Sequence, residues 1–238
     1  MKTNQSQRLR VLRAIEPNAG LRVECAKKVG KALKTLSKEL RKQALACFQD
    51  GDAFMARPDF LDLVAAEIRR MPETEEVLGQ LSMDAKPLEL AQDAWLTQKQ
   101  RNVLKACARA FIKYGLDAKA VSHWFCQKML YQTTDDMIKA LEKAHVNRSI
   151  IRQNWHVPYI KDRYIAPDTL SKLPKEIEWM TKLITKMSRA SCKKVQAELA
   201  RSLEQGQSYS QLKTTLMGLE NMDEERAARV ARDQSCKL

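Results

Sequence analysis

The sequence predicts a mainly α fold, because its apolar residues are spaced as on helices and residues that interrupt helices are scarce. Only 7 glycines and 7 prolines occur in 238 residues, and they fall between segments in which apolar residues recur every three or four positions. That spacing places apolar side chains on one face of a helix. We divide the chain into a helical N-terminal domain (1–145), an irregular, extended connector (146–173) and the beginning of a helical C-terminal domain (174–238).

The N-terminal domain opens with the longest of these patterns. A turn at 16–20 precedes a helix predicted over Leu21–Phe48, and an Asp-Gly pair at 50–51 ends that helix. A Pro-Asp pair favours the start of a second helix, over 58–70. A short acidic piece at 73–78 follows.

Three further helices are predicted before the connector. Thr97 caps the first, and Gly115 ends it. Asp117 caps the second. A Thr-Asp-Asp run at 134–136 opens the third, which reaches about Ala144, with its two carboxylates at the positive end of the helix dipole.

The connector is distinguished by β-branched and aromatic residues broken by prolines, so we expect extended chain in which a short strand can form. Pro174 then starts a long helix that runs to about Leu203, and Gly206 breaks it. A further helix ends at Gly218, and the last one begins near Asp223.

The charge of the chain is positive and unevenly distributed. Its 42 basic and 29 acidic residues give a net charge of +13. Residues 1–50 carry 12 basic and 4 acidic side chains, a net +8, whereas residues 51–100 carry 5 and 10, a net −5. An excess of lysine either solvates exposed helix faces or binds a polyanion, and composition does not separate these interpretations.

One flank of the first long helix is the best candidate for contact with phosphate groups. Its basic residues follow one another at three- and four-residue steps: Lys27, Lys31, Lys34, Lys38 and Arg41. If they contact a duplex, binding should be sensitive to salt and largely indifferent to base sequence.

A second candidate lies in the connector, where basic residues alternate with aromatic ones: Arg152, Trp155, Tyr159, Lys161, Arg163 and Tyr164. That mixture suits either a nucleic-acid contact or a protein interface anchored by aromatic rings and arginine. The other tryptophans, Trp95, Trp124 and Trp179, are interpreted as apolar anchors of helices.

The sequence contains no catalytic motif that binds nucleotides, activates a serine or holds zinc. The acidic pairs at 75–76 and 135–136 fit helix starts or solvated faces better than acid–base catalysis. His123 could serve Cys126 as a base, but Cys126 follows Trp124 and Phe125 in a segment typical of a core. We therefore predict no catalytic residue, no enzyme activity and no cofactor.

The six cysteines and three histidines do not predict a metal site or a disulfide framework. No two cysteines form a CxxC pair, and the histidines are scattered. Cys47, Cys107 and Cys126 lie in apolar helical segments, so we expect reduced, buried thiols. Neither a signal peptide nor a run of about 20 apolar residues is present, so we expect no membrane contact.

Three stretches of the chain occur in an order that resembles a known family. The first is Arg-Ala-Ile-Glu-Pro-Asn-Ala-Gly at 13–20. The second is 174–217, where a long predicted helix is followed by a Gly-Gln-Ser-Tyr turn at 206–209 and by a further helix. The third, within 222–238, is a terminal motif formed by Arg226, Ala227, Arg229, Val230, Ala231, Asp233, Gln234 and Lys237. Together they resemble the minor head (head morphogenesis) proteins of the Mu F-like family of phages.

The resemblance implies a structural protein of a phage or prophage head that acts at the portal vertex in procapsid assembly and in DNA packaging or delivery. Its partners would be the portal protein, other head or scaffold proteins and packaged double-stranded DNA. It would occupy the host cytoplasm during assembly and then the virion head. The alternative is a basic helical nucleic-acid-binding protein unrelated to capsids.

In that family the chain usually continues past the terminal motif, whereas this one ends inside it. A shortened chain, a degraded prophage gene and a processed product all fit. A last helix without its hydrophobic partners should fray, so we expect rapid amide exchange over 222–238.

Overall fold

The computed structural model describes residues 18–71, 95–143, 157–159, 163–165 and 167–235, and it confirms a mainly α protein. The helices and strands in chain order are α2 (Ala19–Gln49), the short 3-10 helix η1 (Phe54–Ala56), α3 (Phe60–Arg70), α5 (Gln98–Lys143), β1 (Val157–Tyr159), β2 (Arg163–Ile165), α7 (Pro167–Glu204) and α8 (Tyr209–Ser235). The acidic piece predicted at 73–78 lies outside the described residues.

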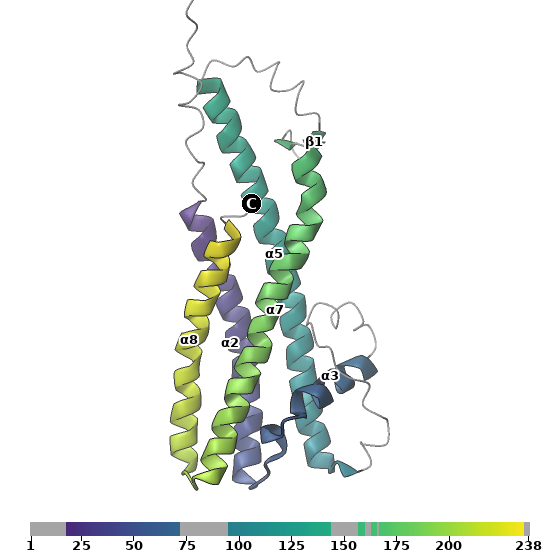
Figure 1. The fold of residues 1–238 in the computed structure, drawn as a ribbon, viewed down its shortest axis with the longest axis vertical. Coiled ribbons are helices and arrows are strands. Elements are labelled where there is room, and N and C mark those ends of the chain that lie inside the picture. The colour runs from purple at the N-terminus through teal and green to yellow at the C-terminus, as the bar shows by residue number, and fades with distance from the viewer. Residues whose placement is uncertain (1–17, 72–94, 144–156, 160–162, 166, 236–238) are drawn as a thin grey trace, which may run out of the picture.

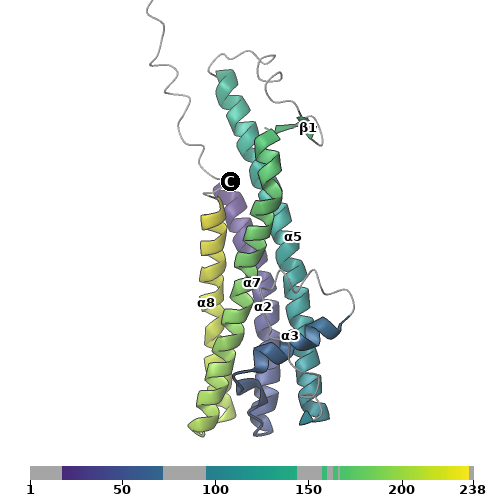
Figure 2. The same cartoon turned by 45° about the vertical axis from the view of Figure 1, so that its right-hand side comes forward.

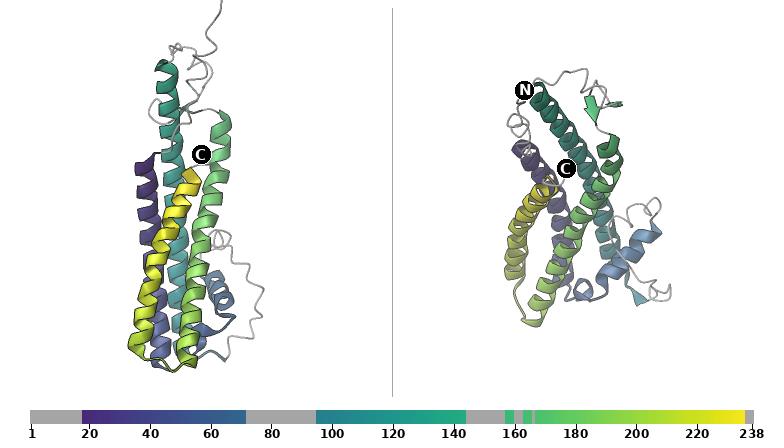
Figure 3. Two further views of the ribbon diagram at one scale, coloured as in Figure 1. Left: turned by 60° about the vertical axis from the view of Figure 1, so that its left-hand side comes forward. Right: turned by 45° about the horizontal axis from the view of Figure 1, so that its top comes forward.

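The long helices α2, α5, α7 and α8 form an up-down-up-down bundle (Figures 1 and 2). Around the bundle α2 packs against α5, α5 against α7, α7 against α8, and α8 against α2. The shorter α3 lies against α5 near one end, and α5 and α7 extend beyond α2 and α8 at the other end (Figure 3). Each long helix thus buries one face against at least two of the others, which is the usual packing of a helical bundle.

Local residues explain both ends of α2. The Asn18 side chain accepts a hydrogen bond from the Leu21 amide at 3.0 Å, which satisfies one of the free N–H groups at the helix start. After the last turn, Gly51 has a φ of 64°, in the left-handed region that favours glycine. The predicted helix over Leu21–Phe48 and its Asp-Gly stop are therefore confirmed, with the first turn added.

The bundle has one hydrophobic core, to which all four long helices contribute. Tyr114 of α5 is buried, and its hydroxyl donates a 2.8 Å hydrogen bond to the Ile184 carbonyl of α7. Buried hydroxyls such as Ser122, Thr181 and Ser188 donate to carbonyls of their own helix at 2.6–2.8 Å. These small side chains let helices pack closely without leaving a buried donor unsatisfied.

The predicted breaks at Gly115 and at 134–136 are wrong, because α5 is one continuous helix of 46 residues. Gly115 is buried in its middle, between the buried Phe111 and Ala118. An interior glycine costs about 1 kcal/mol relative to alanine, which apolar burial on both sides outweighs. Thr134 is itself buried and does not cap a helix.

The predicted helix end at Gly218 and new start near Asp223 are also wrong, since α8 passes through both positions. Gly218 is exposed, and buried residues precede it at Leu212 and Leu216 and follow it at Ala227 and Ala231. The apolar face that α8 presents to the core therefore continues past the glycine, and tertiary packing outweighs the local preference.

The connector contains the short strand that was expected, paired with a second one. β1 and β2 are antiparallel, with Tyr159 opposite Arg163 and Pro158 opposite Tyr164. Helix α7 begins at Pro167 and not at Pro174, which lies inside the helix. Both prolines suit a first helical turn, and Pro167 occupies it. Pro174 is exposed, so water can hydrate the carbonyl that its missing N–H leaves without a partner.

Helices from both sides of the predicted connector share the core, since α8 packs against α2 and α7 against both α2 and α5. Residues 1–145 and 174–238 therefore contribute to one bundle where the structure describes them, and the division into domains stays a prediction from the sequence. The last helix was expected to lack hydrophobic partners. As far as Ala231 it has them, because Ala227 and Ala231 are buried.

Candidate nucleic-acid interface

Four predicted phosphate-binding lysines lie together on the solvent side of α2, and we call Lys27, Lys31, Lys34 and Lys38 the lysine face. All four are exposed. They fall within an arc of about 60° and span about 16 Å, given 3.6 residues per turn and a 1.5 Å rise. The buried Leu33 and Leu36 lie on the other side of the helix, so the lysine face is available to a ligand.

The charges of the lysine face are not balanced by carboxylates within the part of the chain that the structure describes, since none of the four lysines forms an ion pair there. The neighbouring Lys28 differs, because its ammonium lies 3.5 Å from Glu24 and 4.7 Å from the ring centre of Trp124. A row of unpaired cations on a straight helix raises the local positive potential and attracts polyanions.

The fifth predicted residue, Arg41, is half-buried and so contributes less to this surface. In the connector, Arg152, Trp155 and Lys161 lie outside the described residues. Arg163 is in β2, in a hairpin that contacts α5 and lies beyond the N-terminal end of α2 (Figure 1). The fold therefore does not place Arg163 on the lysine face.

The fold places a second set of cations beside Lys38 that the sequence analysis missed. A groove of about 700 Å³ runs between α2 and α5, and we call it the α2–α5 groove. Its rim carries Lys38 and Lys42 from α2 together with Arg109 and Lys113 from α5, all of them exposed. The only sequence signal was the four-residue spacing of Arg109 and Lys113, which does not reveal which helix lies beside them.

Residues of the terminal motif divide into two groups. Ala227 and Ala231 are buried and Val230 is half-buried, so the apolar residues of the motif lie on the core side of α8. Arg226 is half-buried and Arg229 is exposed. The side chains of Asp233 and Gln234 are not described, and Lys237 lies outside the described residues.

Cys126 and His123 do not form a nucleophile–base pair. Cys126 is completely buried, with its Sγ 3.9 Å from the Sδ of Met180. His123 is exposed, and its ring lies 3.4 Å from the Gln127 amide. The predicted core positions of Cys47, Cys107 and Cys126 are confirmed. Among the residues that can be described, no group of three or more His, Cys, Asp or Glu could hold a metal ion.

The predicted role of the tryptophans as apolar anchors holds only in part. Trp124 and Trp179 are half-buried. Trp95 is 45% exposed, and the guanidinium of Arg57 lies 4.3 Å from its ring centre. A cation over an aromatic face is attracted by the ring electrons, which holds Trp95 at the surface.

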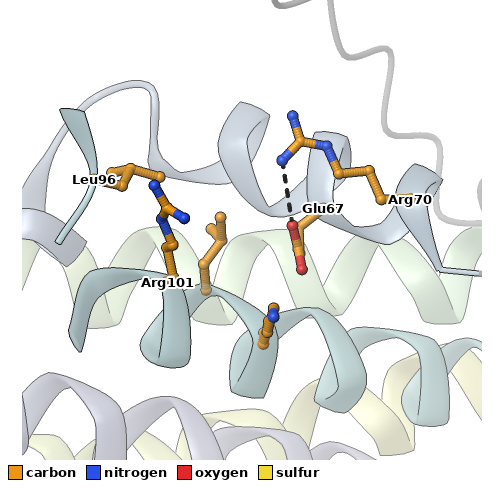
Figure 4. Close-up of a pocket in the computed structure, with 6 residues that line it drawn as sticks. Glu67, Arg70, Leu96 and Arg101 are labelled. Carbon is orange, nitrogen blue, oxygen red and sulfur yellow. Dashed lines mark ion pairs between the residues drawn. The ribbon is translucent and has the colours of Figure 1, made fainter. Parts of the chain in front are cut away.

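A smaller cavity of about 280 Å³ lies between α3 and α5 (Figure 4). Its charged residues include Glu67, Arg70 and Arg101. Glu67 is buried, and its carboxylate lies 3.6 Å from the Arg70 guanidinium, the pair marked in Figure 4. The carboxylate of Glu67 lies in the cavity and already pairs with Arg70, so an anion would bind less favourably here than at the lysine face.

Among the described helices, none is both long enough and apolar enough to cross a bilayer. No protein-family model matches the sequence, and no curated protein or solved structure matches it. Arguments about function therefore depend on the surfaces described above and on the resemblance of the three sequence stretches.

Proposed function

We propose that this chain is a structural protein of a phage or prophage head, and that it binds packaged double-stranded DNA through the lysine face of α2. The observation that carries the DNA contact is the row formed by Lys27, Lys31, Lys34 and Lys38, exposed and without ion-pair partners in the described chain. A duplex carries one negative charge per about 1.7 Å of axis, so a row of this length spans several phosphates.

The head assignment is supported by the resemblance of residues 13–20, 174–217 and 222–238 to Mu F-like minor head proteins. A rigid bundle with a charged face suits a protein that acts by binding within a larger assembly. Its partners would then be the portal protein and other head or scaffold proteins. It would pass from the host cytoplasm to the virion head.

Binding of the full chain to labelled duplexes of two unrelated sequences tests the DNA contact. We expect equal affinities for the two duplexes and a dissociation constant that rises steeply with salt, because counterions are released from the phosphates. Changing Lys27, Lys31, Lys34 and Lys38 together to Gln should weaken binding and reduce the slope of log Kd against log salt by about 1 for each lost contact.

The matched control changes four exposed lysines of α7 to Gln: Lys172, Lys175, Lys186 and Lys193. It removes the same net charge and should leave most of the salt slope intact. No binding at low salt, or equal losses in both variants, would exclude the lysine face as the DNA contact.

Co-assembly separates a head protein from a basic nucleic-acid-binding protein unrelated to capsids. The chain is expressed with a portal protein and a scaffold protein of a phage head, and procapsids are purified by sedimentation. We expect the chain in the portal-containing fraction, with a gene that lies between portal and scaffold or protease genes. A chain that binds DNA but stays out of these particles would favour the alternative.

A further inference from the structure

The α2–α5 groove combines an apolar floor with a cationic rim. The buried Ala32, Leu36 and Tyr114 form part of the floor, and the half-buried Ala106 and Ala110 complete it. Three of these five residues are alanines, so the floor is recessed between two antiparallel helices. An elongated ligand would lie along them.

The rim is positively charged on both sides of the groove. Lys38 and Lys42 come from α2, and Arg109 and Lys113 come from α5. Two carboxylates, Glu39 and Asp117, also line the groove. Glu39 is already engaged within α2, where it accepts a 2.7 Å hydrogen bond from Gln43 and lies 3.9 Å from Lys42. The rim therefore keeps a cationic excess that an acidic ligand would balance.

The apolar floor distinguishes the ligand of this groove from DNA. The outer surface of a duplex is lined by phosphates, which would gain nothing from alanine and leucine side chains. An amphipathic helix places apolar side chains every three or four residues, and these can fill a groove while charged flanks meet its rim. A ligand that matches both the floor and the rim therefore carries an apolar stripe bordered by Asp and Glu.

We propose that the α2–α5 groove is a docking site for an acidic amphipathic helix of a partner protein. Apolar side chains of that helix occupy the floor at Ala106 and Ala110, and its carboxylates pair with Arg109, Lys113 and Lys38. This site is independent of the proposed DNA contact except that Lys38 belongs to both surfaces.

A designed peptide of 20 residues tests the site, with leucines on one helical face, glutamates on the others and a fluorescent label. A scrambled peptide of the same composition, without the leucine stripe, measures binding by charge alone. We expect the full chain to bind the amphipathic peptide about tenfold more tightly than the scrambled one, because only the former fills the floor.

Two variants test the rim and the floor separately. Arg109→Glu with Lys113→Glu should weaken peptide binding about tenfold, whereas Lys186→Glu with Lys193→Glu on α7 should change it less than about twofold. Ala110→Arg adds a positive charge but blocks the floor, so it should weaken peptide binding and leave duplex binding equal or stronger. Its control is Ala197→Arg, at an exposed position of α7.

Circular dichroism and thermal unfolding confirm that each variant is folded before its affinity is compared. Equal binding of both peptides, or unchanged peptide binding by Ala110→Arg, would overturn the docking site. The docking site would also be overturned if a duplex displaced the peptide completely and if duplex binding were lost in the Arg109→Glu, Lys113→Glu variant but kept in Ala110→Arg. The groove would then be a nucleic-acid site. A variant that changes only Lys27, Lys31 and Lys34 to Gln spares Lys38, so it should weaken duplex binding and keep peptide binding, which would distinguish a failure of the DNA contact from a failure of the docking site.

Discussion

At the scale of single residues, burial decides what the cysteines can do. Cys25, Cys47, Cys107, Cys126 and Cys192 are all buried, free thiols. Burial raises the pKa of Cys25 and of Cys192 to about 12 and that of Cys47 to about 11. A thiol with so high a pKa stays protonated near neutral pH, and a protonated thiol is neither a good nucleophile nor a metal ligand.

The raised thiol pKa values predict a loss of stability at alkaline pH. The unfolded chain releases these protons near pH 9, whereas the folded chain holds them until about pH 11 to 12. The stability that the neutral thiols contribute is therefore complete below pH 9 and is lost as the pH rises above it, by on the order of 1 kcal/mol for each thiol at pH 10. Urea unfolding at pH 8 and pH 10 measures the loss.

Lysines and tyrosines titrate in the same range, so the comparison needs a variant. Changing Cys25 and Cys47 to Ala should lower stability at pH 8 by leaving small cavities, but should also make the drop between pH 8 and pH 10 smaller. An identical drop in the variant and the original chain would show that these thiols do not cause it.

The residues of the lysine face were predictable because helical spacing alone places Lys27, Lys31, Lys34 and Lys38 opposite an apolar stripe. Arg109 and Lys113 were not, because their importance depends on α2 lying beside α5. That pairing is a tertiary contact between residues about 70 positions apart. The hydrophobic pattern shows which face of a helix is buried but not which helix covers it.

At the scale of elements, glycine was the least reliable guide to where helices end. Gly51 and Gly206 end α2 and α7, and both have a positive φ. Gly115 and Gly218 lie inside α5 and α8. The amino acid is the same in each case, and the outcome depends on whether buried residues continue on the same face beyond it.

Two glycine substitutions should therefore act with opposite signs. Gly218 lies within a helix, and a methyl group there would meet no atom within 4 Å, so Gly218→Ala should stabilise the chain by about 0.5–1 kcal/mol. Gly206 has a φ of 58°, so Gly206→Ala should destabilise it by about 1 kcal/mol. Chemical denaturation of both variants measures the difference. If Gly218→Ala destabilised the chain, α8 would end there after all.

At the scale of the whole molecule, the bundle joins segments that the sequence analysis assigned to different domains. The helical periodicity of 21–48 and of 174–203 predicted both helices, but it contained nothing to show that they share one core. Likewise, the burial of Ala227 and Ala231 depends on packing of α8 against α2 and α7. The spacing of residues within a segment predicts that a helix forms, but it does not predict which other helices pack against it.

A shared core predicts that the four long helices open together. Amides around Ala227 and Ala231 should exchange as slowly as those around Leu33 and Leu36, because both pairs are buried in the same cluster. Hydrogen exchange followed by mass spectrometry measures both regions. The turn at 205–208, in which three of the four residues are exposed, should exchange faster than either buried region and is an internal reference. Rapid exchange throughout 209–235 with α2 protected would return the chain to two separate units.

The up-down-up-down path also decides how anything attached to the bundle is presented. Helix α2 begins and α8 finishes at the same pole of the bundle, and the opposite pole is closed by the turns after α2 and α7 (Figures 1 and 3). Residue 18 and residue 235 therefore lie at the same pole. A label or a fused domain attached at residue 18 or at residue 235 would lie at this pole and would leave the opposite pole uncovered.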